Sequence, residues 1–128
     1  MSSPGLVLDT PAILAYTDGS TRVGLEIAEV ADEGLQVVLP AACLAIAYQH
    51  AASDRWSLLD ILSTLPQVVV KPVDHEICAV LGGWARTLGL DLAHAGIESA
   101  GVPPVPILTD RRRQLEKFVP KGWPIVDL

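Results

Sequence analysis

The chain has 128 residues, which is enough for one domain with a substantial core and too few for two comfortable ones. Half of the residues are hydrophobic and 19% are charged, which excludes a disordered chain and favours a compact globule with fully buried elements. With three Trp, two Tyr and one Phe, the chain offers few rings for stacking on single-stranded nucleic acid.

The net charge of −6 disfavours long-range attraction to phosphate backbones, although it leaves room for a local basic patch. Residues 1–108 carry 4 Lys or Arg against 12 Asp or Glu, a balance of −8. Residues 109–128 carry 5 against 3, a balance of +2. The positive charge is therefore concentrated near the C-terminus.

The two cysteines and the apolar segments bear on the compartment. Cys43 and Cys78 lie far apart in apolar, helix-like stretches, without the close pairing that zinc or redox motifs need, so we expect both to be reduced core residues. The chain shows no signal-peptide pattern, and no apolar run approaches the length that spans a membrane. These features predict a soluble cytoplasmic protein.

Five short apolar runs bounded by turn or capping residues are typical of buried strands. They comprise residues 6–8, 37–39, 68–70, 107–108 and 125–126. Stretches with helical periodicity separate them, and strands that alternate with helices predict parallel crossover connections. We therefore expect one domain over residues 1–128, with a three-layer α/β/α fold around a central, mostly parallel five-stranded sheet.

Periodicity and capping residues place the helices between these strands. Ser20 is the expected N-cap of an amphipathic helix that stops near Gly34. Further helices are expected over residues 41–52, 54–65, 73–89, 91–100 and 110–118. One face of the helix over residues 73–89 carries Ile77, Val80, Leu81 and Trp84. Asp91 and Asp110 would then stand at the N-termini of the last two helices.

Acidic residues follow the expected strands where functional groups collect in open parallel sheets, at the carboxyl ends near the topological switch point. Asp9 directly follows the first strand, Asp110 follows the fourth, and Asp91 begins a helix between strands three and four. Grouped carboxylates can hold Mg²⁺ or Mn²⁺, which activates water and stabilises a phosphodiester transition state. Each aspartate also has a structural explanation as a helix cap, so the residues alone leave both interpretations open.

The order of these motifs resembles the PIN-domain family, especially the toxin ribonucleases of VapBC toxin–antitoxin pairs. Residues 6–16 are similar to the first strand and helix of the family, residues 38–48 to its second strand and the following helix, and residues 91–95 and 107–110 to its last two acidic motifs. The resemblance covers essentially the whole chain. It implies a PIN-like fold, Mg²⁺ or Mn²⁺ as cofactor, and Asp9, Asp91 and Asp110 as catalytic and metal-binding residues.

The resemblance places Thr10, Ile46 and Thr109 at the edge of the pocket, and three departures from the family pattern bear on its chemistry. Ile46 stands where the family usually has a glutamate, and isoleucine cannot bind a cation. Asp110 follows the threonine immediately, so Arg111 takes the usual place of the acid. Pro11 replaces a frequent serine. Fewer acids predict weak metal binding or none.

Arg111, Arg112 and Arg113 form a basic run beside Asp110. They could contact RNA phosphates or neutralise the acidic pocket, and the alternative is a solvated run of charges. The family resemblance implies RNA, an antitoxin-like protein or a second copy of the chain as partners, and no membrane.

Three other α/β families fit less well. A receiver domain needs paired acids after strand one, dinucleotide binding needs a glycine-rich turn, and aspartyl phosphatases carry a second Asp near the first. Two hypotheses therefore stand. The chain is a metal-dependent PIN-type endoribonuclease with an impaired site, or it is a catalytically silent PIN-fold binding module, which Ile46 favours.

Overall fold

The computed structural model describes residues 2–128, and within them five strands form a single sheet. The strands are β1 (Pro4–Leu8), β2 (Gln36–Pro40), β3 (Val68–Lys71), β4 (Ile107–Thr109) and β5 (Ile125–Asp127). Their order is β3-β2-β1-β4-β5, and every neighbouring pair is parallel. The five predicted strands and the α/β class are confirmed, and the sheet is parallel throughout.

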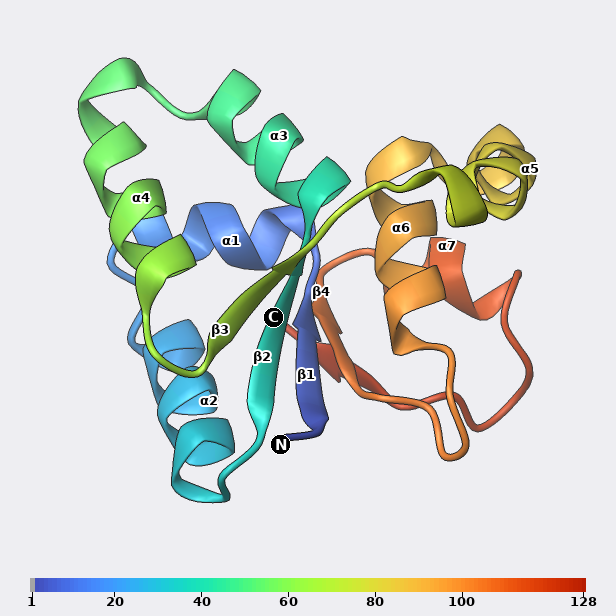
Figure 1. The fold of residues 1–128 in the computed structure, drawn as a ribbon, viewed down its shortest axis with the longest axis horizontal. Helices are drawn as coiled ribbons and strands as arrows, with labels where there is room; N and C mark the ends of the chain where they lie inside the picture. Colours follow the sequence, from blue (N-terminus) through green and yellow to red (C-terminus); the bar gives the residue numbers. More distant parts are fainter. Residues whose placement is uncertain (1) are drawn as a thin grey trace.

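Helices cover both faces of this sheet, as Figure 1 shows, with α1, α2 and α4 on one side and α5, α6 and α7 on the other. The helices are α1 (Thr10–Thr17), α2 (Thr21–Asp32), α3 (Ala41–His50), α4 (Trp56–Thr64), α5 (Cys78–Leu88), α6 (Leu90–Ser99) and α7 (Arg112–Glu116). Two 3-10 turns, η1 (Ser53–Arg55) and η2 (His75–Ile77), precede α4 and α5. None of the helices within residues 2–128 has both the length and the apolar character that a membrane crossing requires.

The strand order places a topological switch between β1 and β4. The chain moves from β1 outward through β2 to β3, and then crosses back so that β4 and β5 lie on the other side of β1. Leu8 pairs with Leu108, and the backbone N–H of Asp9 donates to the Leu108 carbonyl at 3.1 Å. The residues that follow β1 and β4 therefore leave the sheet side by side, which is where ligand sites form in such folds.

The predicted amphipathic helix is confirmed as α2. The Ser20 hydroxyl accepts from the Val23 N–H at 3.3 Å, and Val23, Ile27 and Val30 form its buried face. The helix ends at Asp32, and Gly34 follows with a φ of +73°, a backbone conformation that glycine adopts without strain. The capping residues and the buried face therefore both support the helix that was predicted for this segment.

Helix α5 differs from the prediction in its start and in its buried face. It begins at Cys78, after the 3-10 turn η2, and Val80 is 49% exposed although it was expected on the apolar face with Leu81. Cys78 is exposed, so the expectation that both cysteines lie in the core is wrong for Cys78. The physical reason is that α5 packs mainly on α6 with one narrow face, which leaves apolar side chains of the opposite face in solvent.

The prediction that acidic residues stand at the N-termini of the last two helices is confirmed for Asp91 and is wrong for Asp110. Gly89 is the N-cap of α6, and Asp91 lies in the first turn of that helix. Helix α7 covers Arg112–Glu116 instead of residues 110–118, and Asp110 does not cap it because the N-cap is Arg111. The side chain of Asp110 is therefore not held at a helix terminus in the way that the sequence suggested.

A buried histidine joins two of the helices near the switch point. His94 of α6 is fully buried, and its Nδ1 accepts from the backbone N–H of Ala42 in the first turn of α3 at 3.2 Å. Its Nε2 faces a carboxylate oxygen of Glu98 at 3.2 Å. Because the N-cap Pro40 has no side-chain acceptor, His94 supplies the cap that α3 otherwise lacks.

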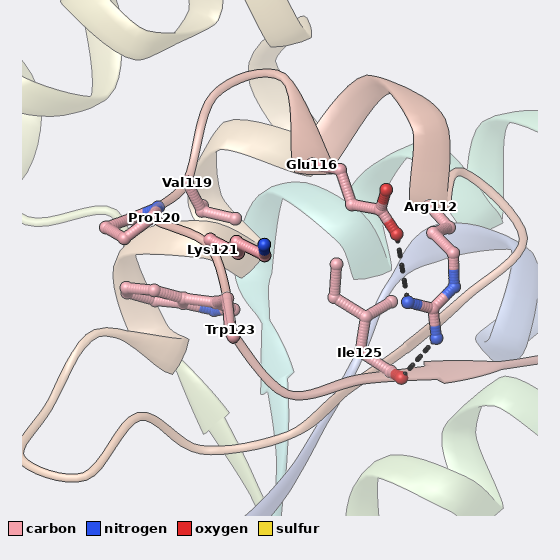
Figure 2. Close-up of a pocket in the computed structure, with 8 residues that line it drawn as sticks. Arg112, Glu116, Val119, Pro120, Lys121, Trp123 and Ile125 are labelled. Carbon is pink, nitrogen blue, oxygen red and sulfur yellow. Dashed lines mark hydrogen bonds and ion pairs between the residues drawn. The ribbon is translucent and has the colours of Figure 1, made fainter.

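Arginine side chains lie along the outer edge of β5. The Nη2 group of Arg22 donates to the Asp127 carbonyl at 2.7 Å, and that of Arg112 donates to the Ile125 carbonyl at 2.6 Å (Figure 2). The carbonyl of Pro124, the residue before β5, instead accepts from the Ile107 N–H in β4. These contacts fasten α2 and α7 to the end of the sheet.

The first testable prediction concerns the contact between α5 and α6. A Cβ at Gly96 would lie 3.0 Å from Trp84 Cζ3, and Trp84 is itself packed edge-on against Phe118. We expect Gly96→Ala to lower the free energy of unfolding by about 1 kcal/mol, because the indole has to move out of a packed position. Urea unfolding of the variant gives the measurement.

The matched control is Gly82→Ala in α5, where an added Cβ meets no atom within 4 Å. This change should raise the free energy of unfolding by about 0.5–1 kcal/mol through helix propensity alone. Equal effects of the two substitutions would contradict the proposed packing role of Gly96.

Candidate functional site

Asp9 is the centre of the site at the switch point, and its side chain is fully buried. It is the N-cap of α1, and its Oδ1 accepts from the Thr10 N–H at 2.8 Å. Its Oδ2 accepts from the hydroxyl of Thr109, the last residue of β4, at 2.6 Å. The end of β1, the start of α1 and the end of β4 therefore all meet at this carboxylate.

Asp91 approaches from the first turn of α6 and lies beside Asp9. Its Oδ2 accepts from the Thr10 hydroxyl at 2.6 Å, so that Thr10 contacts both acids. The thiol of Cys43 in α3 lies between the same two residues, 3.1 Å from the Asp91 carbonyl and 3.8 Å from Asp9 Oδ1. Two of the three acids predicted to meet are thus brought together.

The cation of this site is Arg111, which follows β4. Its Nε donates to Asp9 Oδ2 at 3.0 Å and its Nη2 to Asp9 Oδ1 at 2.5 Å, which makes a bidentate pair. The same Nη2 donates to Asp91 Oδ2 at 3.0 Å. The backbone N–H of Arg111 donates to the Thr109 hydroxyl at 2.9 Å, which fixes the turn that aims the guanidinium at the acids.

The electrostatics favour the charged forms of this cluster. Burial alone would raise the pKa of Asp91, but hydrogen bonds from Thr10 and Arg111 and the charge of the guanidinium hold it below its ordinary value. Burial would lower the pKa of Arg111, but its bonds to Asp9 and Asp91 raise it. Burial and the negative charge of Asp9 raise the pKa of the Cys43 thiol well above its usual range, so Cys43 stays protonated.

These residues do not fit a divalent metal. Within residues 2–128, no three His, Cys, Asp or Glu side chains are grouped so that they could hold an ion. Both carboxylates near the switch point already bond a guanidinium that lies between them. Ile46, one turn beyond Cys43 on α3, brings no oxygen to the pocket edge. A small hydrated cation would have to displace Arg111 and bind with two protein acids at most.

Asp110 is the predicted acid that the structure leaves apart. It is exposed, and within residues 2–128 it does not join Asp9 and Asp91 in a group that could hold a metal ion. Arg111, the next residue, points into the site in its stead. A base therefore lies beside Asp9 and Asp91 where the sequence predicted a third acid.

The three arginines of the basic run differ in their interaction partners. Arg111 is committed to the acidic pair, and Arg112 bonds Asp127 at 2.7 Å and Glu116 at 3.0 Å. Arg113 is exposed and forms no ion pair with any of residues 2–128. Of the two uses that the sequence suggested for this run, the geometry realises neutralisation of the acidic pocket at Arg111.

The contribution of Cys43 to the site was missed by sequence reasoning. Its apolar surroundings indicated a core residue, and it is indeed buried. The signal that could have located it is its position on the first turn of the helix that follows β2, at the same carboxyl edge of the sheet as Asp9.

No protein-family model and no curated protein matches the sequence. Among solved structures, the chain is similar to one in the crystal structure of VapBC2 from Rickettsia felis bound to a DNA fragment from their promoter, with a TM-score of 0.69. The match covers 96% of this chain and 98% of that chain at 11% sequence identity. The fold is PIN-like. At this identity the likeness concerns the arrangement of helices and strands and not their chemistry.

The second prediction tests the bridge that Arg111 forms between Asp9 and Asp91. Arg111→Met should lower the free energy of unfolding by about 3–5 kcal/mol, because it leaves two carboxylates in a desolvated site without their cation. Arg113→Met, an exposed and unpaired position in the same run, should change it by no more than about 0.5 kcal/mol. Chemical denaturation of both variants measures the difference, and equal values would mean that Arg111 is not a structural partner of the acids.

The third prediction concerns pH. The pKa of Asp91 is lowered in the folded protein. The stability that Asp91 contributes is therefore present at pH values above its pKa in the unfolded chain, and it is lost as the pH falls through its pKa in the folded protein. The free energy of unfolding should therefore decrease below about pH 4. Asp91→Asn should be less stable at neutral pH and should lose less on acidification, whereas the exposed Asp32→Asn should follow the wild type. Parallel acid profiles of Asp91→Asn and wild type would refute this assignment.

Proposed function

We propose that this chain is a PIN-like domain that works as a binding protein and not as a metal-dependent nuclease. The observation that carries this proposal is the guanidinium of Arg111 between Asp9 and Asp91. The bridge supplies from within the chain the positive charge that grouped carboxylates need. It also removes the reason for the site to take up a cation from solution.

The chemistry of the remaining groups supports the same conclusion. Asp9 is fully buried and uses both carboxylate oxygens for hydrogen bonds, so neither is free to activate water. Cys43 is buried, and its raised pKa keeps it as a thiol rather than the nucleophilic thiolate. Thr10 and Thr109 donate their hydroxyl protons to the acids. The cluster therefore holds strands and helices together instead of presenting a reactive group.

The similar solved structure suggests the kind of partner. Its title describes a VapBC2 complex bound to promoter DNA. By analogy, we propose an antitoxin-like protein as the partner of this chain, with a second copy of the chain as the alternative. RNA is the less favoured partner because the chain is acidic overall and two of the three arginines in its basic run are already paired.

The second candidate is a Mg²⁺- or Mn²⁺-dependent endoribonuclease. It is favoured by one observation, the convergence of Asp9 and Asp91 with Thr10 at the carboxyl end of β1. This candidate requires Arg111 to leave the acids and another residue to complete the site. It makes the opposite prediction in the experiment that follows.

The fourth prediction is a gain of metal binding on redesign. The double variant Ile46→Glu with Arg111→Asp places acids at the two positions where the family resemblance implies an acid and this chain has none. Its melting temperature should rise with added Mn²⁺, since binding to the folded state alone stabilises it. The wild-type melting temperature should not respond, and wild-type protein should not cleave a labelled single-stranded RNA.

Matched controls separate the two candidates. Adding Asp9→Asn to the double variant should abolish the response to Mn²⁺, and circular dichroism should establish that each variant is folded. Wild-type cleavage that stops in chelator and in Asp9→Asn would overturn the proposed function in favour of the nuclease. A double variant that folds but whose melting temperature does not change with Mn²⁺ would show that the geometry of the pocket differs from that of a metal site.

A further inference from the structure

The two hydrogen bonds of His94 define the protonation state of its ring. Nδ1 accepts from the backbone N–H of Ala42 at 3.2 Å, so this nitrogen carries a lone pair and no proton. A neutral imidazole then has its proton on Nε2, which lies 3.2 Å from a carboxylate oxygen of Glu98 and donates to it. Because the ring is fully buried, both nitrogens depend on these two partners. His94 is therefore neutral as long as its bond to Ala42 is intact.

A second proton on this ring is incompatible with the contact to α3. An imidazolium carries an N–H on both nitrogens, so Nδ1–H would face the N–H of Ala42, donor against donor. The first turn of α3 also bears the positive end of the helix dipole, which opposes a cation at that place. Protonation of His94 and its contact with the start of α3 therefore exclude each other.

Glu98 determines which of the two helices gives way. It stands one turn beyond His94 on α6, and its carboxylate accepts from Nε2–H more strongly when the ring is charged. This bond keeps the ring on its own helix. The start of α3 has no comparable support, since its N-cap Pro40 makes no side-chain hydrogen bond. On protonation, the first turn of α3 is therefore the part that is released.

The elements packed most closely on α6 bring no further charge to the ring. Strands β1, β2 and β4 carry no titratable side chain. The titratable side chains of α3 and α5 bond other partners or are exposed, and they are Cys43, Tyr48, His50, Cys78 and Arg86. Among residues 2–128, Glu98 is the group that forms an ion pair with His94. The response of the ring to pH thus depends on Glu98 and on the start of α3.

The start of α3 is also one wall of the acidic cluster. The Cys43 thiol donates to the Asp91 carbonyl at 3.1 Å, and the Thr10 hydroxyl lies 3.4 Å from the Cys43 carbonyl. Cys43 follows Ala42 directly, so a movement of Ala42 away from His94 takes Cys43 with it. The contact of His94 with Ala42 therefore controls how firmly α3 closes over Asp91.

We propose that the contact between His94 and Ala42 is a pH-sensitive switch. At neutral pH the neutral ring caps α3 and holds it against α6. An imidazole without such contacts takes up its second proton at about pH 6.5, so release of the first turn of α3 follows below about pH 6. Release withdraws Cys43 from Asp91 and opens that side of the cluster. This inference does not rest on the proposed function, because it concerns the response of one helix start to acid.

The fifth prediction is a loss of protection at the Ala42 amide on acidification. This N–H lies in the first turn of α3, where no helical carbonyl is available, and its acceptor is His94. Its hydrogen-exchange protection factor, corrected for the intrinsic effect of pH, should fall about tenfold per pH unit below about pH 6, because release takes up one proton. Amide exchange followed by NMR gives the measurement. The Val23 amide of α2 is the matched control, since the Ser20 hydroxyl that caps it does not titrate.

Two variants separate titration of the ring from a merely structural role. His94→Asn retains an acceptor near the position of Nδ1 and removes the titrating group, so the protection of Ala42 should become independent of pH. Glu98→Gln, at a partly exposed position, keeps an acceptor for Nε2–H without the charge, and it provides the test if His94→Asn does not fold. It should move the loss of protection to lower pH by about half a unit. Glu29→Gln, at an exposed position of α2, should leave the profile unchanged.

The starting state of the ring is checked by long-range ¹H–¹⁵N NMR spectra, with the exposed His50 and His75 as references. At neutral pH, His94 should carry its proton on Nε2. Three results would overturn the proposal: a proton on Nδ1 at neutral pH, protection of Ala42 that does not change with pH, or an equal loss of protection at Val23. None of these measurements involves Mn²⁺ or Arg111, so failure of the switch and failure of the proposed function are distinguishable.

Discussion

The bidentate bond between Arg111 and Asp9 is the interaction on which the centre of this fold depends. Asp9 has no access to solvent, and a carboxylate so placed is stable only with a cation and a full set of hydrogen bonds. Arg111 supplies the cation, and Thr10 and Thr109 supply the remaining donors. Because these groups come from α1, β4 and the turn after β4, one charge cluster holds the two halves of the sheet together at their switch point.

A guanidinium and a metal ion differ in how much access they leave to the acids for water and substrate. An ion at grouped acids keeps open positions for water and substrate, and it exchanges with solution. Arg111 is covalently part of the chain, and three of its N–H bonds already reach the two acids. In this PIN-like fold a guanidinium of the chain itself therefore closes the pair of acids. The contacts that stabilise the buried carboxylates also occupy their oxygens.

The sheet and the meeting of Asp9 with Asp91 were predictable because both follow from chain order. Short apolar runs define strands, and parallel topology brings their carboxyl ends to one edge. The direction of side chains beyond the strands was not predictable in this way. Asp110 and Arg111 are adjacent in sequence, and the turn after Thr109 decides which of them enters the site. Cys78 and Val80 were assigned to the core from hydrophobicity, which cannot tell a helix packed on one face from one packed all round.

The arginines along β5 have a consequence for how this protein behaves among its own copies. In a parallel sheet the edge strand exposes alternate carbonyls that invite another strand to pair. On β5 the two outward carbonyls, those of Ile125 and Asp127, are already bonded by Arg112 and Arg22. An incoming backbone would find these acceptors filled and two long charged side chains in its way. These contacts disfavour the addition of another strand at the β5 edge of the sheet.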